Sequence, residues 1–83
     1  MQYTVTHSRR DRDGDIIGLG KPADWYDTSQ NIINHIESGR HSFIVAVGGR
    51  WVNVIVKQGP YRKYLATTAD GYEKNNLDNL PPM

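Results

Sequence analysis

The sequence contains no cysteine among its 83 residues. This absence excludes disulfide frameworks, cysteine-based zinc sites and thiol nucleophiles. It also fits a reducing compartment, so we expect a cytoplasmic protein. The first residues carry no positively charged segment followed by an apolar run, and therefore we predict no secretory signal.

Long hydrophobic runs and a strong net charge are also lacking. The longest unbroken apolar run is Phe43 to Val47, whereas a membrane-spanning helix needs about 20 apolar residues. Ten Lys and Arg residues stand against nine Asp and Glu residues, giving a formal net charge of +1. This balance does not by itself indicate a nucleic acid or a membrane as partner. The length allows one domain over residues 1–83, with a frayed tail expected at 80–83.

The first third of the chain predicts a β-hairpin followed by a connection. Apolar and polar residues alternate over residues 2–8, and residues 11–15 are rich in Asp and Gly, as tight turns are. Residues 2–20 are therefore predicted to form a hairpin. Residues 21–27 are predicted to be a connection, because Pro22 cannot donate to a strand ladder. Its two aromatic residues, Trp25 and Tyr26, are expected to pack onto the domain.

One helix is predicted after this connection. Thr28-Ser29 supplies hydroxyl groups that accept hydrogen bonds from free first-turn amides, and Gly39 is a typical helix end. The apolar stripe of the helix consists of Ile32, Ile33 and Ile36.

The region from Ser42 to Lys57 gives the strongest pattern in the sequence. Two β-branched runs flank Gly48-Gly49, which predicts a hairpin with a two-residue loop. Its valine-rich face is expected to meet the isoleucine stripe of the helix. That face consists of Phe43, Val45, Val47, Val52, Val54 and Val56, and the opposite face of Ile44, Ala46, Trp51, Asn53 and Ile55.

The last third predicts one more strand and a docked tail. Gly59-Pro60 and Asp70-Gly71 are turn signals on either side of a strand over residues 63–68. Leu77 and Leu80 are expected to dock onto the core. The resulting order is ββαβββ, an α+β fold with one helix packed on a mainly antiparallel, twisted sheet.

The C-terminal half resembles a known family. The stretches that carry the resemblance are Phe43-Ile44-Val45, Arg62-Lys63-Tyr64-Leu65-Ala66-Thr67, Asp70-Gly71 and Asn75-Asn76-Leu77-Asp78-Asn79-Leu80-Pro81. They are similar to a family of small, single-domain bacterial proteins of unknown function. The resemblance implies a free-standing bacterial domain of cytoplasmic location, and it implies no catalytic or binding residue.

The patterns typical of enzymes and metal sites are incomplete. Asp11, Asp13 and Asp15 suggest a calcium loop, but that loop requires Gly at its sixth position and Glu at its twelfth, and the sequence has Ile16 and Pro22 there. The three histidines lack metal-ligand spacing, although the fold still allows His35 and His41 to meet. No serine lies in the strand-to-helix context of a nucleophile. We therefore expect no enzyme, no metal and no cofactor.

Basic and aromatic residues near the later strands form the candidate binding site: Arg50, Trp51, Tyr61, Arg62 and Lys63. Cations for phosphates and aromatic rings for stacking are what single-stranded nucleic-acid binding requires. The alternative is that these cations are surrounded by water and that the aromatic residues only pack within the fold.

A second hypothesis starts from the sheet face that a single helix leaves uncovered. If Ile44, Ala46, Trp51 and Ile55 are exposed, they form an apolar patch of the kind that binds a protein partner or a second copy. In the alternative arrangement, the Trp25-Tyr26 segment or the Leu77/Leu80 tail covers this face. We expect a non-enzymatic interaction module that binds through Trp51, with weak binding of single-stranded nucleic acid as the alternative and no membrane partner.

Overall fold

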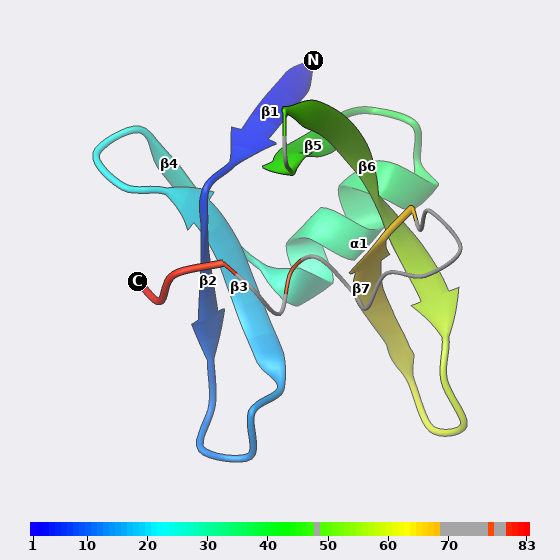
Figure 1. The fold of residues 1–83 in the computed structure, drawn as a ribbon. Helices are drawn as coiled ribbons and strands as arrows, with labels where there is room; N and C mark the ends of the chain where they lie inside the picture. The colour runs from blue at the N-terminus through cyan, green and yellow to red at the C-terminus, as the bar shows by residue number, and fades with distance from the viewer. Residues whose placement is uncertain (48, 69–76, 78–79) are drawn as a thin grey trace.

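The computed structural model describes residues 1–47, 49–68, 77 and 80–83. Within these residues the chain forms seven strands and one helix (Figure 1). Their bounds are β1 Gln2–Val5, β2 His7–Arg10, β3 Ile16–Lys21, β4 Trp25–Thr28, α1 Ser29–Glu37, β5 Ser42–Val47, β6 Arg50–Gln58 and β7 Lys63–Thr67. The predicted α+β class, with one helix and mainly antiparallel strands, is confirmed.

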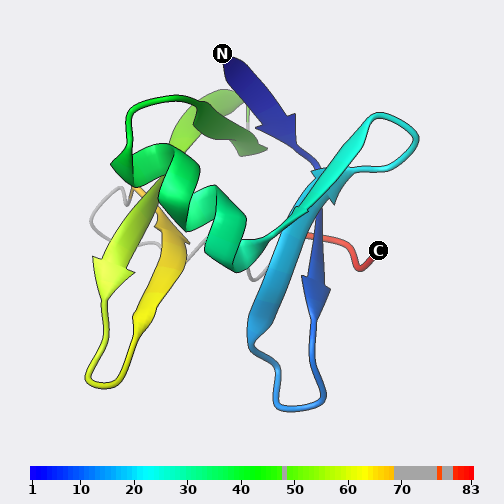
Figure 2. The same cartoon turned by 180° about the vertical axis from the view of Figure 1, so that it is seen from behind.

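The strands form two sheets rather than one. The first has the strand order β1-β5-β6-β7 and the second the order β2-β3-β4. Helix α1 contacts both sheets. In Figures 1 and 2 the β2–β3 and β6–β7 hairpins project side by side in the same direction, below the helix.

The predicted hairpin over residues 2–20 is correct only from His7 onward. His7 pairs with Gly20 and Arg10 pairs with Ile16, on either side of the Asp-rich turn. Strand β1 instead leaves this hairpin and pairs in parallel with β5, with Val5 opposite Val45. The reason is burial, because this pairing leaves Val5 only 1% exposed within the core.

The predicted connection over residues 21–27 is wrong at its C-terminal end. Trp25–Thr28 forms strand β4, which pairs antiparallel with β3 after a turn in which Ala23 has a φ of 68°. The indole Nε1 of Trp25 donates to the carbonyl oxygen of Thr4 at 3.0 Å. Its ring also packs on Tyr3 and Phe43, so the expected packing of Trp25 onto the domain is confirmed.

The predicted helix and the Gly-Gly hairpin are confirmed. The Thr28 hydroxyl accepts from the amide of Asn31 at the start of α1, and Gly39 follows the helix with a φ of 72°. In the hairpin, Val47 pairs with Arg50 and Val45 with Val52, as the two-residue loop predicts. The valine-rich face lies in the core with Ile32 and Ile33: Phe43, Val45, Val52 and Val54 are buried and Val56 is partly buried. The side chain of Val47 is not among those that the structure describes.

The C-terminal segment closes the core and one sheet edge. Leu77 is fully buried, and Arg10 donates to its carbonyl oxygen at 3.1 Å, while Leu80 packs on the core as expected. The sequence predicted a frayed tail at 80–83, but the structure places this segment against β2. The amide of Ser8 donates to Pro81, and the amide of Met83 donates to Ser8. The predicted Asp70-Gly71 turn lies outside the described residues.

Candidate functional site

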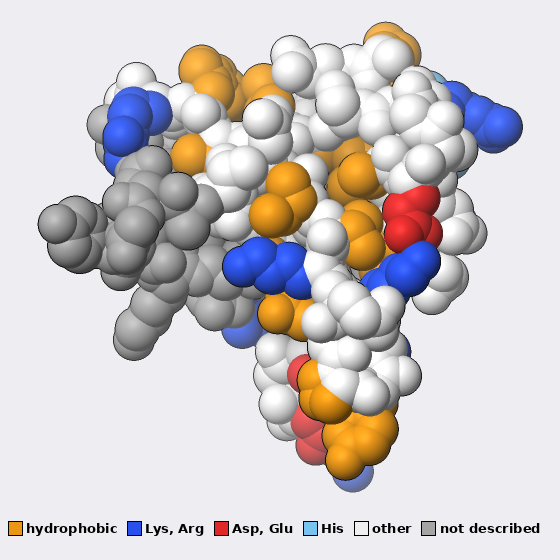
Figure 3. Space-filling view, turned by 90° about the vertical axis from the view of Figure 1, so that its right-hand side faces the viewer, with side chains coloured by type: hydrophobic (Ala, Val, Ile, Leu, Met, Phe, Trp, Pro, Cys, Tyr) orange, Lys and Arg blue, Asp and Glu red, His pale blue; other side chains and the backbone are white. Residues whose placement is uncertain are grey.

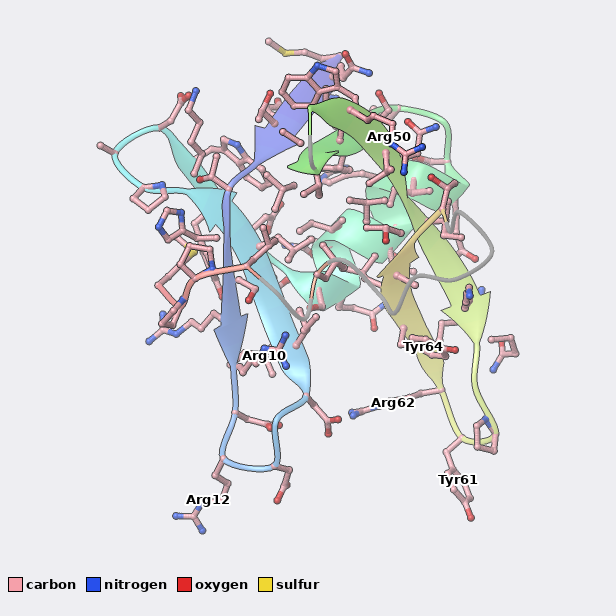
Figure 4. The ribbon with its side chains drawn as sticks, viewed as in Figure 1. Arg10, Arg12, Arg50, Tyr61, Arg62 and Tyr64 are labelled. Carbon is pink, nitrogen blue, oxygen red and sulfur yellow. The ribbon has the colours of Figure 1, made fainter. Side chains whose placement is uncertain are left out.

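The five predicted site residues lie at opposite ends of strand β6. Arg50 and Trp51 begin this nine-residue strand, and Tyr61, Arg62 and Lys63 follow its far end. At about 3.3 Å per residue the two groups are separated by roughly 26 Å. Figure 4 shows Arg50 near the top of the molecule and Tyr61 and Arg62 at the bottom of the β6–β7 hairpin. The structure therefore brings together two subsets, not one cluster.

Trp51 lies on the exposed outer face of the β1-β5-β6-β7 sheet. Its side chain is 60% exposed, although Trp is a large apolar residue. It pairs across the strands with Ala46, and side chains of paired residues share a face. Ala46 and Asn53 are also exposed, whereas Ile44 and Ile55 are half-buried. The apolar outer face is therefore accessible at the Trp51 end.

Trp25 and Leu77, two of the residues considered as covers, pack elsewhere. Trp25 packs on Tyr3 and Phe43, and Phe43 belongs to the core on the opposite side of the sheet. Leu77 is part of that same core. The sequence leaves open whether this sheet face is exposed or covered, and in the structure it is exposed at Trp51.

The four strands of this sheet carry cations and no carboxylate. Their sequences are QYTV, SFIVAV, RWVNVIVKQ and KYLAT, in which the only charged residues are Arg50, Lys57 and Lys63. The acidic residues of the first half lie in the turns and strands of the other sheet and at the end of α1. Within the strands themselves, the sheet that presents Trp51 thus carries only cations, of which Lys63 is paired with Glu37.

At the other end of β6, the predicted cations form ion pairs. Arg62 Nη2 lies 2.8 Å from Asp15 Oδ2, and Lys63 Nζ lies 2.6 Å from Glu37 Oε2. Tyr61 projects from the hairpin end and is 97% exposed. In Figure 3 this hairpin protrudes at the bottom, with hydrophobic side chains at its end. The carboxylate partners weaken the local positive field that a phosphate backbone requires.

The sequence did not predict a groove between the two hairpins. Its volume is about 560 Å³, and the Arg62–Asp15 ion pair joins the two hairpins beside it. The walls include Ile16 and Ile17 from β3, Ser29 and Ile33 from α1, and Tyr64 and Leu65 from β7. These residues are far apart in the chain, so no local pattern signals the groove.

A histidine pair lies at the C-terminal end of α1, where His35 of the last turn and His41 beyond the helix have a ring separation of 4.8 Å. Burial of the His41 ring lowers its pKa, and the N-terminal amine, His35 and Arg40 lower it further. The buried Nδ1 of His41 has no hydrogen-bond partner within the described residues. His35 Nε2 lies 3.5 Å from Asp27. In the part of the chain that the structure describes, no group of three His, Cys, Asp or Glu side chains is placed to hold a metal ion.

The fold and surfaces define a small α+β domain with an exposed aromatic face. Among the described residues, no helix is long and apolar enough to cross a membrane. Residues 4–81 match the model of a family described as a protein of unknown function (DUF3892), and the chain belongs to this family. The expected membership of a family of unknown function is thereby confirmed. Neither the curated proteins nor the solved structures give a match.

Proposed function

We propose that this protein is a non-enzymatic interaction module that binds a protein partner through the outer sheet face around Trp51. The observation that carries the proposal is the 60% exposure of Trp51 on a sheet face. Trp is among the residues that dominate binding energy at interfaces, and exposing it to water is unfavourable. The cysteine-free composition supports a cytoplasmic setting for this interaction.

The charge of the sheet specifies the chemistry of the partner. Lys57 lies on the same face of β6 as Trp51, because successive side chains of a strand alternate between faces, and Arg50 precedes Trp51 at the start of the strand. Because the four strands contain no Asp or Glu, a complementary surface carries an apolar pocket for the indole and carboxylates around it. An acidic polypeptide with exposed apolar side chains meets both requirements. A second copy of the chain is disfavoured, because it brings the same cations to the interface.

Selection from a random peptide library tests this proposal. The folded protein is immobilised, and peptides that also bind a Trp51→Ala variant are removed. We expect the remaining peptides to be rich in Asp and Glu and to contain apolar anchors. Their affinity for Trp51→Ala is expected to fall at least tenfold, because truncation of an anchor residue costs about 2 kcal/mol or more.

Tyr61→Ala provides the matched control, because Tyr61 is also an exposed aromatic residue but lies at the far end of the β6–β7 hairpin. This variant is expected to bind the selected peptides within twofold of the original affinity. Failure to select any peptide that requires Trp51, or an equal loss in both variants, would contradict the proposal. A concentration-dependent dimer that Trp51→Ala abolishes would favour a second copy as the occupant.

A further inference from the structure

We propose that the groove between the β2–β3 and β6–β7 hairpins binds a small amphipathic acid, with its apolar chain between the hairpins and its carboxylate on Arg62. This site is separate from the Trp51 face and goes beyond the proposed interaction. It depends on the size of the groove, its apolar walls and the exposed Arg62 guanidinium beside it.

The groove has the dimensions and lining of a small-ligand site. Its volume of about 560 Å³ lies within the range of about 300–1,000 Å³ typical of such sites. Ile17 contributes an apolar wall that is 41% exposed, and Tyr64 on the facing hairpin is 45% exposed. An apolar chain placed between these side chains removes both from water, which drives binding.

Arg62 is the cation of the groove that a ligand anion can reach. Three charged residues line the groove, Asp15, Arg62 and Lys63, and both cations form ion pairs, Arg62 with Asp15 and Lys63 with Glu37. The Arg62 guanidinium contacts the Asp15 carboxylate, and both side chains are more than half exposed. An exposed ion pair of this kind contributes about 0–1 kcal/mol. A ligand carboxylate therefore competes with Asp15 for the guanidinium at little cost.

Figure 4 shows how Arg62 is placed for this role. Its side chain extends from the β6–β7 hairpin toward the β2–β3 hairpin, whereas Tyr61 points away from the molecule. Arg12 lies at the end of the opposite hairpin and points outward. Arg62 therefore extends into the space between the hairpins whereas Arg12 does not, which makes Arg12 a matched control.

Titration of ¹⁵N-labelled protein with decanoate tests the inference, with decanol and decyltrimethylammonium as probes of the same chain length. We expect decanoate to shift the amide resonances of Ile17, Ser29 and Leu65, which lie on three different elements of the groove. Decanol is expected to bind at least fivefold more weakly, and the cation more weakly still, because only the acid makes a charge-assisted hydrogen bond with Arg62.

Two variants locate the site. Arg62→Gln is expected to weaken decanoate binding about tenfold while leaving decanol binding unchanged. Arg12→Gln, which removes a cation outside the groove, is expected to change neither affinity by more than twofold. Circular dichroism confirms that both variants fold, so that a loss of binding reports on the site.

The outcomes are distinguishable from those of the peptide selection. Trp51→Ala is expected to bind decanoate normally, so that failure of the Trp51 interaction leaves this inference intact. The inference is overturned if decanoate at millimolar concentration shifts no groove amide. It is also overturned if the Trp51→Ala variant loses the decanoate-induced shifts. It is also overturned if decanol binds as tightly as decanoate, because then the groove does not recognise the acid.

Discussion

The two tryptophans occupy opposite environments, and only one of these was predictable. The position of Trp51 follows from the Gly-Gly loop, because pairing of Val45 with Val52 places Trp51 on the opposite face. The position of Trp25 does not follow from its neighbours. Its indole donates to Thr4, which lies 21 residues earlier in the chain. Local patterns thus specify which face of a hairpin each side chain occupies, but they do not specify contacts between distant segments.

His41 is expected to make the free energy of unfolding depend on pH. Its pKa is lowered from the ordinary value of 6.5 by burial, the N-terminal amine, His35 and Arg40. Because the folded pKa lies below the unfolded value, the unfolded chain takes up the proton first as the pH falls. The free energy of unfolding is therefore expected to hold above pH 6.5 and to decline as the pH falls from 6.5 through the lower folded pKa.

Urea unfolding between pH 7.5 and pH 5 measures this dependence. The His41→Phe variant keeps an aromatic ring beside Tyr3 but has no proton to bind, so its decline with falling pH is expected to be shallower. Equal slopes in the original protein and the variant would show that His41 does not cause the pH dependence.

At the scale of elements, strong local signals predicted the helix and the β5–β6 hairpin. Strand β4 was missed because Pro22 indicated a connection, although Trp25–Thr28 consists largely of residues that favour strands. The parallel β1–β5 pair was missed for a different reason. Parallel strands require a long crossover, here β2, β3, β4 and α1, and no residue within β1 specifies its partner.

Two glycines in β3 allow neighbouring groups to approach closely. A Cβ at Gly20 would lie 2.6 Å from the carbonyl oxygen of Trp25 and 2.9 Å from Cε of Met83. Since backbone cannot move aside cheaply, Gly20→Ala is expected to lower the free energy of unfolding by about 1–3 kcal/mol. Chemical denaturation in urea measures this change.

Gly18→Ala is the matched control in the same strand. A Cβ there meets the hydroxyl end of the Tyr26 ring, which is 42% exposed and free to rotate outward. We expect a loss of less than about 1 kcal/mol, because the displaced group is a side chain rather than backbone. If both variants lose the same amount, close backbone approach at Gly20 is not the cause.

At the scale of the whole molecule, the sequence predicted one sheet covered by one helix, whereas the helix joins two sheets whose hairpins project side by side. The groove between them depends on Asp15 and Arg62, which are 47 residues apart. Such a contact arises only once both sheets have packed on the helix. Trp51 and Tyr61 are both exposed, but the fold separates the five candidate residues into two groups that the sequence did not predict.

Chemical-shift mapping of a selected acidic peptide on ¹⁵N-labelled protein shows whether Trp51 anchors the interaction. We expect the largest shifts at the Trp51 indole and at the amides of Ala46, Trp51 and Asn53, with little change at Ile17 or Tyr61. These positions follow the outer face of the sheet. A footprint centred on the groove or on the hairpin end, with the Trp51 indole unmoved, would contradict the claim that Trp51 is the anchor of the interaction.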